Sequence, residues 1–311
     1  MRKLIIDLDP GIGDAVAAVL AMLDPELDLL ALTATSGIVP GPVATRNLYS
    51  IVAHVDPPKW PRIGSASITR NWHKPDEQTS LGTVNGPTGL GDLEIFAPSP
   101  HHKHESAKVL IDIVREYPHQ VTLLTLGPLT NIVAACELAP DFLSQLGELV
   151  CLGGAVSVGG DISAAAEANM YLDPEAARQV LSAPEVKTLV PLDATNSVII
   201  TYDHFNRVST AGRTPATLFL KQLLPYYFRA HHQYLGMEGI WLREVVALAA
   251  VARPPLCKPQ PMRVDVEVAG TLTCGMTVVE RRSHVSARAN TSVVLDVDAQ
   301  GVVDYMTQLL Q

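Results

Sequence analysis

Three acidic side chains are gathered near the start of the chain, in the segment Asp7-Leu8-Asp9-Pro10-Gly11-Ile12-Gly13-Asp14. Residues two apart in a strand share a face, so the carboxylates of Asp7 and Asp9 can converge where an apolar strand ends. The Pro-Gly turn then brings Asp14 back toward them from the next helix. Such a set of hard oxygen ligands suits Ca²⁺, with Mg²⁺ as the alternative. A simpler interpretation, in which Asp14 caps a helix and Asp9 begins a turn, leaves clustered carboxylates without a counterion.

The segments around this cluster alternate between strand and helix patterns. We expect strands over Lys3–Asp9, Leu27–Ser36, Gln120–Leu126, Glu148–Leu152 and Val186–Leu192, and helices over Gly13–Leu23, Pro42–His54, His104–Glu116, Thr130–Leu138, Asp173–Ser182 and Val302–Leu310. This alternation predicts an α/β fold with an open, mostly parallel (mixed) β-sheet flanked by helices. Ligands of such folds bind beyond the carboxyl ends of the strands.

Two further segments depart from the alternation. Gly64–Ser99 is rich in turn residues, and we expect long loops over the site there. Arg263–Ala269 and Met276–Arg282 alternate in polarity on either side of a glycine-containing turn, which predicts a C-terminal β-hairpin. Because no break in composition marks a linker, we expect residues 1–311 to form a single domain.

Composition limits the classes of partner. The chain has 311 residues, of which 47% are hydrophobic and 18% charged, as is typical of a compact globular protein. A net charge of −9 gives no basic footprint for nucleic acid or an anionic membrane, so we expect a small-molecule ligand. The apolar stretch before Asp7 is too short for a signal peptide core, and no stretch of the chain is long enough for a membrane span. The 4 cysteines form no CxxC pair, which indicates reduced thiols and a cytoplasmic protein.

The acidic segment resembles the Asp-x-Asp-Pro-Gly-x-Asp-Asp signature of the inosine-uridine nucleoside hydrolase family. Other segments resemble blocks of that family in the same order, namely Gly127–Asn131, Glu167–Ala177, Leu192–Thr195, Val266–Glu267 and Gly275–Thr277. The resemblance covers nearly the whole chain and implies a nucleoside-hydrolase-like fold. It also implies hydrolysis of the N-glycosidic bond of a nucleoside or related riboside, releasing the free base and ribose, in a homodimer or homotetramer.

The resemblance further implies a metal site. Its Ca²⁺ would be bound by Asp9, Asp14, Glu244 and the backbone carbonyl of Leu126, with Asp9 also acting as general base. A metal lowers the pKa of the water bound to it, and a neighbouring carboxylate can take the proton before the water attacks the sugar. Asp7 is expected to stand behind Asp9 and hold the loop rather than to bind the ion.

Several positions depart from the family pattern in the expected sugar and base pocket. Gly13 replaces the first of the paired aspartates, and Ile38 stands where asparagine is usual. Asn85 takes the place of a histidine and Asp161 that of an asparagine, whereas Glu167 and Asn169 match. We expect the substrate-binding residues to be Asn85, Asp161, Glu167, Asn169, Tyr227, His231 and Arg243.

Arg243 is the sharpest departure, because it stands where the family has a histidine just before the late acid. Arginine stays protonated and cannot pass a proton to a leaving purine. Leaving-group activation would then rest on charge stabilisation, or on Tyr227 and His231, which lie four residues apart on a predicted helix. An ordinary solvent-facing pair is the alternative for these two residues.

We therefore expect the metal site to persist and the substrate to differ from a standard purine ribonucleoside handled in the standard way. Two alternatives stay open. One is a non-catalytic riboside-binding or metal-binding protein on the same fold, which the altered pocket residues favour. The other is a haloacid-dehalogenase-type phosphatase, which the strand ending in Asp7-Leu8-Asp9 suggests.

Overall fold

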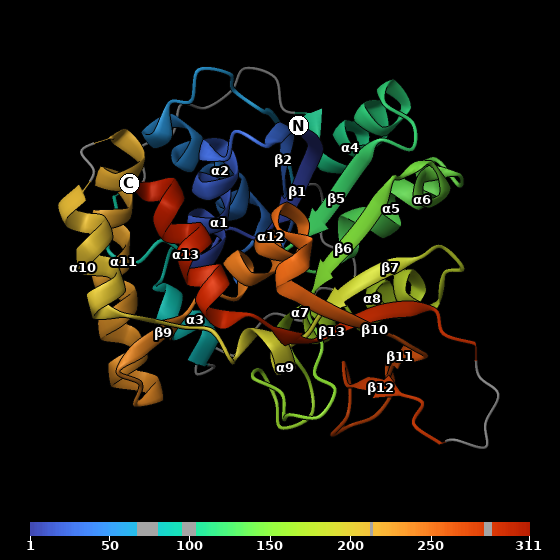
Figure 1. Cartoon of the computed structure of the whole chain (residues 1–311). Helices are drawn as coiled ribbons and strands as arrows, with labels where there is room; N and C mark the ends of the chain where they lie inside the picture. Colours follow the sequence, from blue (N-terminus) through green and yellow to red (C-terminus); the bar gives the residue numbers. More distant parts are fainter. Residues whose placement is uncertain (67–79, 95–103, 212–213, 283–287) are drawn as a thin grey trace.

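A mixed sheet runs through the centre of the protein in the computed structural model, which describes residues 1–66, 80–94, 104–211, 214–282 and 288–311 (Figure 1). In spatial order, its strands within these ranges are β10 (Cys257–Met262), β13 (Thr291–Val297), β7 (Lys187–Val190), β6 (Glu148–Leu152), β5 (Val121–Thr125), β1 (Arg2–Leu8), β2 (Leu27–Ala34), β3 (Arg62–Ser65) and β4 (His104–Glu105). Neighbouring strands pair in parallel, except that β10 is antiparallel to β13. The expected open, mostly parallel sheet is confirmed.

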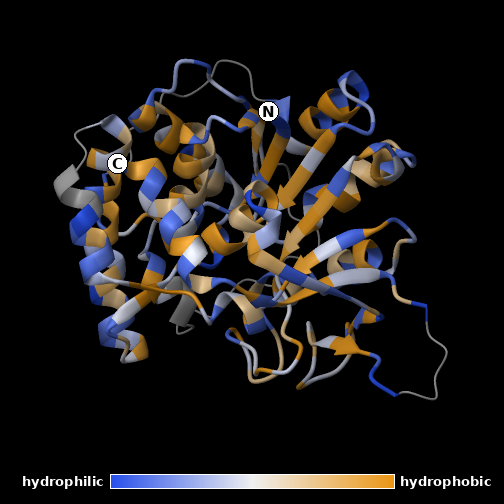
Figure 2. Ribbon diagram, viewed as in Figure 1, coloured by the Kyte–Doolittle hydropathy of each residue, from blue (hydrophilic) through white to orange (hydrophobic). Residues whose placement is uncertain are grey.

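Alternate side chains of the central strands point into two separate cores. In β1, Leu4, Ile6 and Leu8 join one apolar cluster, whereas Ile5 joins the other. Because helices cover both faces, these strands are apolar along their whole length rather than on one side only. The hydropathy colouring of the ribbon shows this in the central strands (Figure 2).

The helices are divided between the two faces. Helices α1 (Ile12–Leu23), α2 (Gly41–Val55), α11 (Pro215–Leu235), α12 (Arg243–Ala252) and α13 (Ala299–Leu310) contribute to one core, and α4 (Ser106–Glu116), α5 (Thr130–Leu138), α6 (Phe142–Gln145) and α8 (Pro174–Ser182) to the other. The expected helices are confirmed with shifted ends. The helix α12 was missing from the expected set because its residues from Val245 to Ala252 are all apolar, so no polar face marks it as a helix.

Shorter elements complete the chain. They are α3 (Ser80–Asn85), α7 (Ala168–Leu172), α9 (Leu192–Thr195), α10 (Tyr202–Ala211), the 3₁₀ helix Pro254–Leu256, and the antiparallel pairs β8 (Ile199–Thr201) with β9 (Gly239–Trp241) and β11 (Val264–Val266) with β12 (Thr277–Val279). The C-terminal hairpin is confirmed as β11 and β12, with strands shorter than expected. Within the expected loop region Gly64–Ser99, α3 is helical, while residues 67–79 and 95–99 lie outside the described part of the chain.

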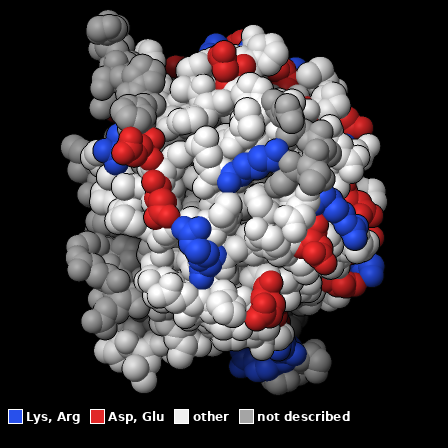
Figure 3. Space-filling view, turned by 90° about the vertical axis from the view of Figure 1, so that its left-hand side faces the viewer, with Lys and Arg blue, Asp and Glu red and all other residues white. Residues whose placement is uncertain are grey.

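The distribution of charge on the described surface and the state of the cysteines show no special feature. On the face shown in Figure 3, acidic and basic side chains are interspersed rather than gathered by sign. All four cysteines are free. No helix in the described ranges combines the length and the apolar character that a membrane crossing needs.

Candidate functional site

Asp9 lies directly after β1, where the carboxyl ends of three strands meet. An added Cβ at Gly37, which follows β2, would lie 1.9 Å from Asp9 Oδ2, and one at Gly127, which follows β5, would lie 2.6 Å from Asp9 Oδ1. Neither position can carry a side chain while the Asp9 carboxylate stays in place. The two glycines therefore form a narrow slot that fixes the carboxylate between the strand ends.

The Asp9 carboxylate is almost completely removed from solvent, with 1% of the residue exposed. Its Oδ2 accepts a hydrogen bond of 2.6 Å from the backbone N–H of Ile38. Burial raises the pKa of Asp9 to about 8 against the lowering effect of the Ile38 hydrogen bond, and the charges of Glu244 and Asp7 raise it further. A carboxylate in this setting attracts either a proton or a cation.

Asp14 and Glu244 reach the same region from the first turns of α1 and α12. Asp14 Oδ2 accepts a hydrogen bond of 2.9 Å from the backbone N–H of Gly11. Asp14 Oδ1 and Glu244 Oε2 are buried without a hydrogen-bond partner among the described residues. Burial raises the pKa of both carboxyl groups, and the charges of Asp9 and Glu244 raise that of Asp14 further.

These residues fit a hard divalent cation by their chemistry. No three His, Cys, Asp or Glu side chains in the described ranges already stand in a metal-binding arrangement. The donors are nevertheless all oxygens, two of them are buried without partners, and burial disfavours their ionised forms unless a positive charge is close by. The carbonyl of Leu126 accepts a hydrogen bond from Asn169 and keeps a second lone pair for a ligand. A cation would supply the missing compensation.

Asp7 lies behind this cluster with its side chain held by two neighbouring elements. Its Oδ1 accepts hydrogen bonds of 2.5 Å from Thr33 Oγ1 in β2 and 2.8 Å from Asn131 Nδ2 in α5. Burial raises the pKa of Asp7 to about 7, while these two hydrogen bonds lower it. Thr33 was not among the expected site residues, because its contact with Asp7 depends on strand register rather than on any local motif.

A cavity of about 250 Å³ opens above the cluster. Its lining includes five of the expected substrate-binding residues, and Glu244 also lies on its wall. The lining residues are Ile38, Val84, Asn85, Gly159, Gly160, Asp161, Leu192, Asn196, Tyr227, His231, Leu235, Trp241, Arg243 and Glu244. A mostly apolar pocket with a few convergent polar groups is the usual form of a small-molecule site.

Arg243 is held on one side of the cavity by two partners. Its Nη1 forms an ion pair with Asp161 Oδ2, and both side chains are largely buried, with 14% and 12% exposed. Its guanidinium also lies over the Trp241 ring at 4.9 Å from the centroid. Arg243 Nε is buried without a hydrogen-bond partner in the described structure, and the residue forms part of the cavity lining.

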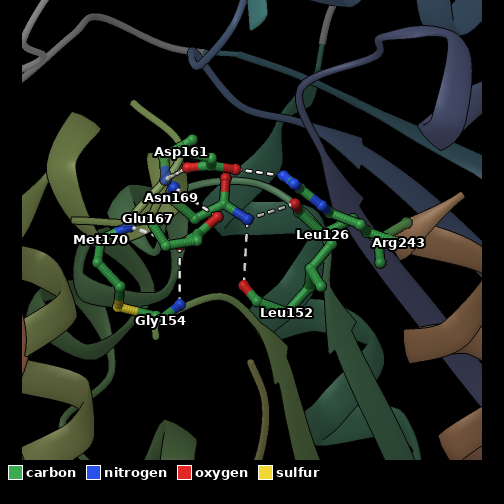
Figure 4. A network of polar contacts seen from close by, with 9 residues as sticks. Leu126, Leu152, Gly154, Asp161, Glu167, Asn169, Met170 and Arg243 are labelled. Atoms are coloured by element: carbon green, nitrogen blue, oxygen red, sulfur yellow. Dashed lines mark hydrogen bonds and ion pairs between the residues drawn. The ribbon is translucent and has the colours of Figure 1, made fainter. Parts of the chain in front are cut away.

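Glu167 and Asn169 are not part of the cavity lining, and their side chains are bonded to backbone groups (Figure 4). The Glu167 carboxylate accepts from the N–H groups of Asn169, Met170 and Gly154. Asn169 Nδ2 donates to the carbonyls of Leu126, at 2.7 Å, and Leu152, at 3.1 Å. The two expected substrate residues therefore tie the carboxyl ends of β5 and β6 to the loop that carries Asp161.

Tyr227 and His231 lie on the buried side of α11, where they line the cavity rather than face solvent. His231 Nδ1 lies 3.0 Å from the Tyr227 carbonyl, which can only accept, so Nδ1 carries the proton and Nε2 is left as an acceptor. Burial lowers the pKa of His231 to about 4, helped by the Arg243 charge. Burial likewise raises the pKa of the Tyr227 phenol. Neither side chain is a strong proton donor at neutral pH.

Asn85 lies at the end of α3, where it contacts the start of α1. Its Oδ1 accepts a hydrogen bond of 2.8 Å from the N–H of Ile12. Asn47, which the sequence did not single out, donates to the carbonyls of Pro10 and Thr88 and joins the same two segments. These contacts fix the helix end that carries Asp14.

Comparison with known proteins gives a consistent result. A family model described as inosine-uridine preferring nucleoside hydrolase matches residues 4–304. Uridine nucleosidase 1 of Arabidopsis thaliana is 33% identical, with 98% of this chain and 92% of the relative covered. The inosine-uridine preferring nucleoside hydrolase of Crithidia fasciculata is 31% identical, over 96% of this chain and 93% of the relative.

The fold matches solved structures as well. The purine-preferring ribonucleoside hydrolase from Gardnerella vaginalis superposes with a TM-score of 0.89 at 27% sequence identity, covering 99% of this chain and 98% of that one. The similarity in sequence and in structure extends over the same, nearly complete length.

Proposed function

From the premise that this chain belongs to the inosine-uridine preferring nucleoside hydrolase family, we propose that it is a Ca²⁺-dependent nucleosidase acting at Asp9. Proteins of this family are hydrolases of N-glycosyl compounds, and the chain hydrolyses nucleosides. The observation that carries the finer proposal is the buried set of Asp9, Asp14 and Glu244, of which Glu244 lines the cavity, with two carboxylate oxygens left without partners.

Asp9, Asp14, Glu244 and the Leu126 carbonyl would hold the ion. When bound, Ca²⁺ supplies a positive charge that aligns sugar hydroxyls and makes a coordinated water more acidic. We favour Ca²⁺ over Mg²⁺, because Mg²⁺ demands near-ideal octahedral geometry and is seldom bound by a cage made only of protein groups.

Asp9 then serves as the general base. The Ile38 N–H holds its Oδ2, so the carboxylate keeps a fixed orientation while it takes a proton from the attacking water. The oxygen of this water forms a new bond to the anomeric carbon of an oxocarbenium-like ribosyl group as the bond to the base nitrogen breaks. The electron pair of the broken bond leaves with the base.

Arg243 and His231 support a particular kind of leaving base. Arg243 lines the cavity with a permanent positive charge and guanidinium N–H donors, and His231 offers Nε2 as an acceptor. A base with a carbonyl next to a ring N–H, such as uracil, matches this donor and acceptor pair. It also spreads its leaving charge onto its carbonyl oxygens, which a fixed cation stabilises without donating a proton. We therefore propose uridine as a preferred substrate.

Base release from a panel of purine and pyrimidine nucleosides, with Ca²⁺ or with a chelator, tests the proposal. We expect chelator-sensitive release, with uridine cleaved faster than adenosine. An equal rate of base release with Ca²⁺ and with the chelator would contradict the role of Ca²⁺. Tight ligand binding without product would favour the non-catalytic alternative, and phosphate release from an aryl phosphate would favour the phosphatase alternative.

A further inference from the structure

Gly13 occupies a position where its backbone conformation does not require glycine. It lies in the first turn of α1 and is absent from the described residues with positive φ. Glycine is less favourable than alanine inside a helix, since it loses more conformational freedom on folding. Local backbone geometry therefore gives no reason for the residue, and the surroundings must supply one.

The carboxylate of Glu244 fills the space where a side chain at position 13 would begin. An added Cβ at Gly13 would lie 2.0 Å from Glu244 Oε2, 2.4 Å from its Cδ and 2.7 Å from its Oε1. These separations are well inside van der Waals contact, so a Cβ and the observed carboxylate position exclude each other. The three nearest atoms all belong to this one side chain.

The clash would act on the site rather than on the fold. The carboxylate stands at the end of a flexible side chain, so it can turn away while the backbones of α1 and α12 stay in place. Turning away would withdraw the unpartnered Oε2 from the region of Asp14 Oδ1. Bulk at position 13 should therefore weaken cation binding before it weakens folding.

We propose that Gly13 is a positioning residue whose missing side chain admits the Glu244 carboxylate to the cation site beside Asp9 and Asp14. The inference rests on the proposed function, because it takes the cation as the ligand of these carboxylates. In this joint role, the effect of a larger residue 13 on cation binding depends on whether residue 244 carries a charge.

A cycle of four proteins tests the pairing: the unmodified chain, Gly13→Ala, Glu244→Gln and the double variant. Glutamine keeps the shape of Glu244 and removes its charge. The readouts are the Ca²⁺ dissociation constant from calorimetric titration and the Tm in chelator. We expect each single substitution to weaken Ca²⁺ binding at least tenfold, and the double variant to bind within about twofold of Glu244→Gln alone. Tm in chelator should stay close to that of the unmodified chain for Gly13→Ala.

The outcomes distinguish a failure of the Gly13–Glu244 pairing from a failure of the proposed Ca²⁺ site. Unchanged Ca²⁺ affinity in Gly13→Ala, or an equal loss from this change in the Glu and Gln backgrounds, would overturn the pairing alone. A large fall of Tm in chelator would assign the glycine to packing and overturn it too. If the unmodified chain binds no Ca²⁺, the proposed cofactor and the pairing both fail.

Discussion

At the scale of single residues, Asp9 is the side chain on which the proposed chemistry depends most directly. Replacing it with Asn keeps its size and an oxygen for the Ile38 N–H but removes the base. We expect kcat to fall by about 10²–10⁴, the usual contribution of general acid–base catalysis, while Tm in chelator does not fall. Asp203→Asn, at an exposed position, is the control and should leave kcat unchanged. Retention of most activity in Asp9→Asn would contradict the role as base.

His231 gives a second residue-level prediction, through the pH dependence of stability. Its pKa is about 4 in the folded chain against an ordinary 6.5, so the unfolded chain binds a proton first as pH falls. The stability that neutral His231 contributes is complete above pH 6.5 and is lost as pH falls toward 4, by about 3 kcal/mol in all. Relative to the unmodified chain, His231→Gln should lose less stability over this interval in denaturant titrations. Parallel curves for the two proteins would contradict the buried, neutral histidine.

At the scale of elements, the start of α1 depends on an anchor from α3. Asn85 Oδ1 satisfies the buried N–H of Ile12, which a helix of this kind leaves without an internal partner. Asn85→Ala should lower the free energy of unfolding by about 1–3 kcal/mol and weaken Ca²⁺ binding, because Asp14 lies in the same helical turn. Denaturant titration with calcium titration measures both effects. A loss of stability with unchanged Ca²⁺ affinity would separate the anchor from the site.

Sequence patterns predicted the elements whose signal is local and missed those whose signal is not. β1 and β5 are apolar runs with clear ends, so they and Asp9 could be predicted. The strand β10 contains Pro259 and Pro261, which indicate no strand, yet it is tolerated at the edge of the sheet. Likewise Asn131 contacts Asp7 across 124 residues, a contact that no local spacing encodes.

The departure at Gly13 shows the same limit within the site. From the sequence, Gly13 and Glu244 are two separate changes, a missing acid and an acid that is too long. Only the folded chain shows that one change makes room for the other. The pairing of Arg243 with Asp161 likewise depends on the folded chain, since their ion pair joins segments that are 82 residues apart.

At the scale of the whole molecule, the chain folds around several carboxyl groups that lack a compensating charge. Burial raises the pKa of Asp7 to about 7 and that of Asp9 to about 8, from an ordinary value near 3.8. At pH values between the ordinary pKa and the raised one, each of these two carboxyl groups keeps its proton in the folded chain but has released it in the unfolded chain. Without metal, the contribution of these two carboxyl groups to stability therefore falls as pH rises from about 4 to 8, with a slope of up to about 1.4 kcal/mol per pH unit for each group, whereas neutral His231 acts in the opposite direction below pH 6.5.

Calcium should reverse this trend, because an ion can take the place of the protons at the carboxylates. A ligand that binds only the folded state adds stability that grows with the ratio of free ligand to Kd. The Kd for Ca²⁺ falls as pH rises, because fewer protons compete for the carboxylates. The gap between Tm in Ca²⁺ and Tm in chelator should thus widen from pH 5 to pH 8. Calorimetric scans at several pH values measure it, with Mg²⁺ as a matched comparison. A gap independent of pH would mean that the ion binds away from the buried carboxylates.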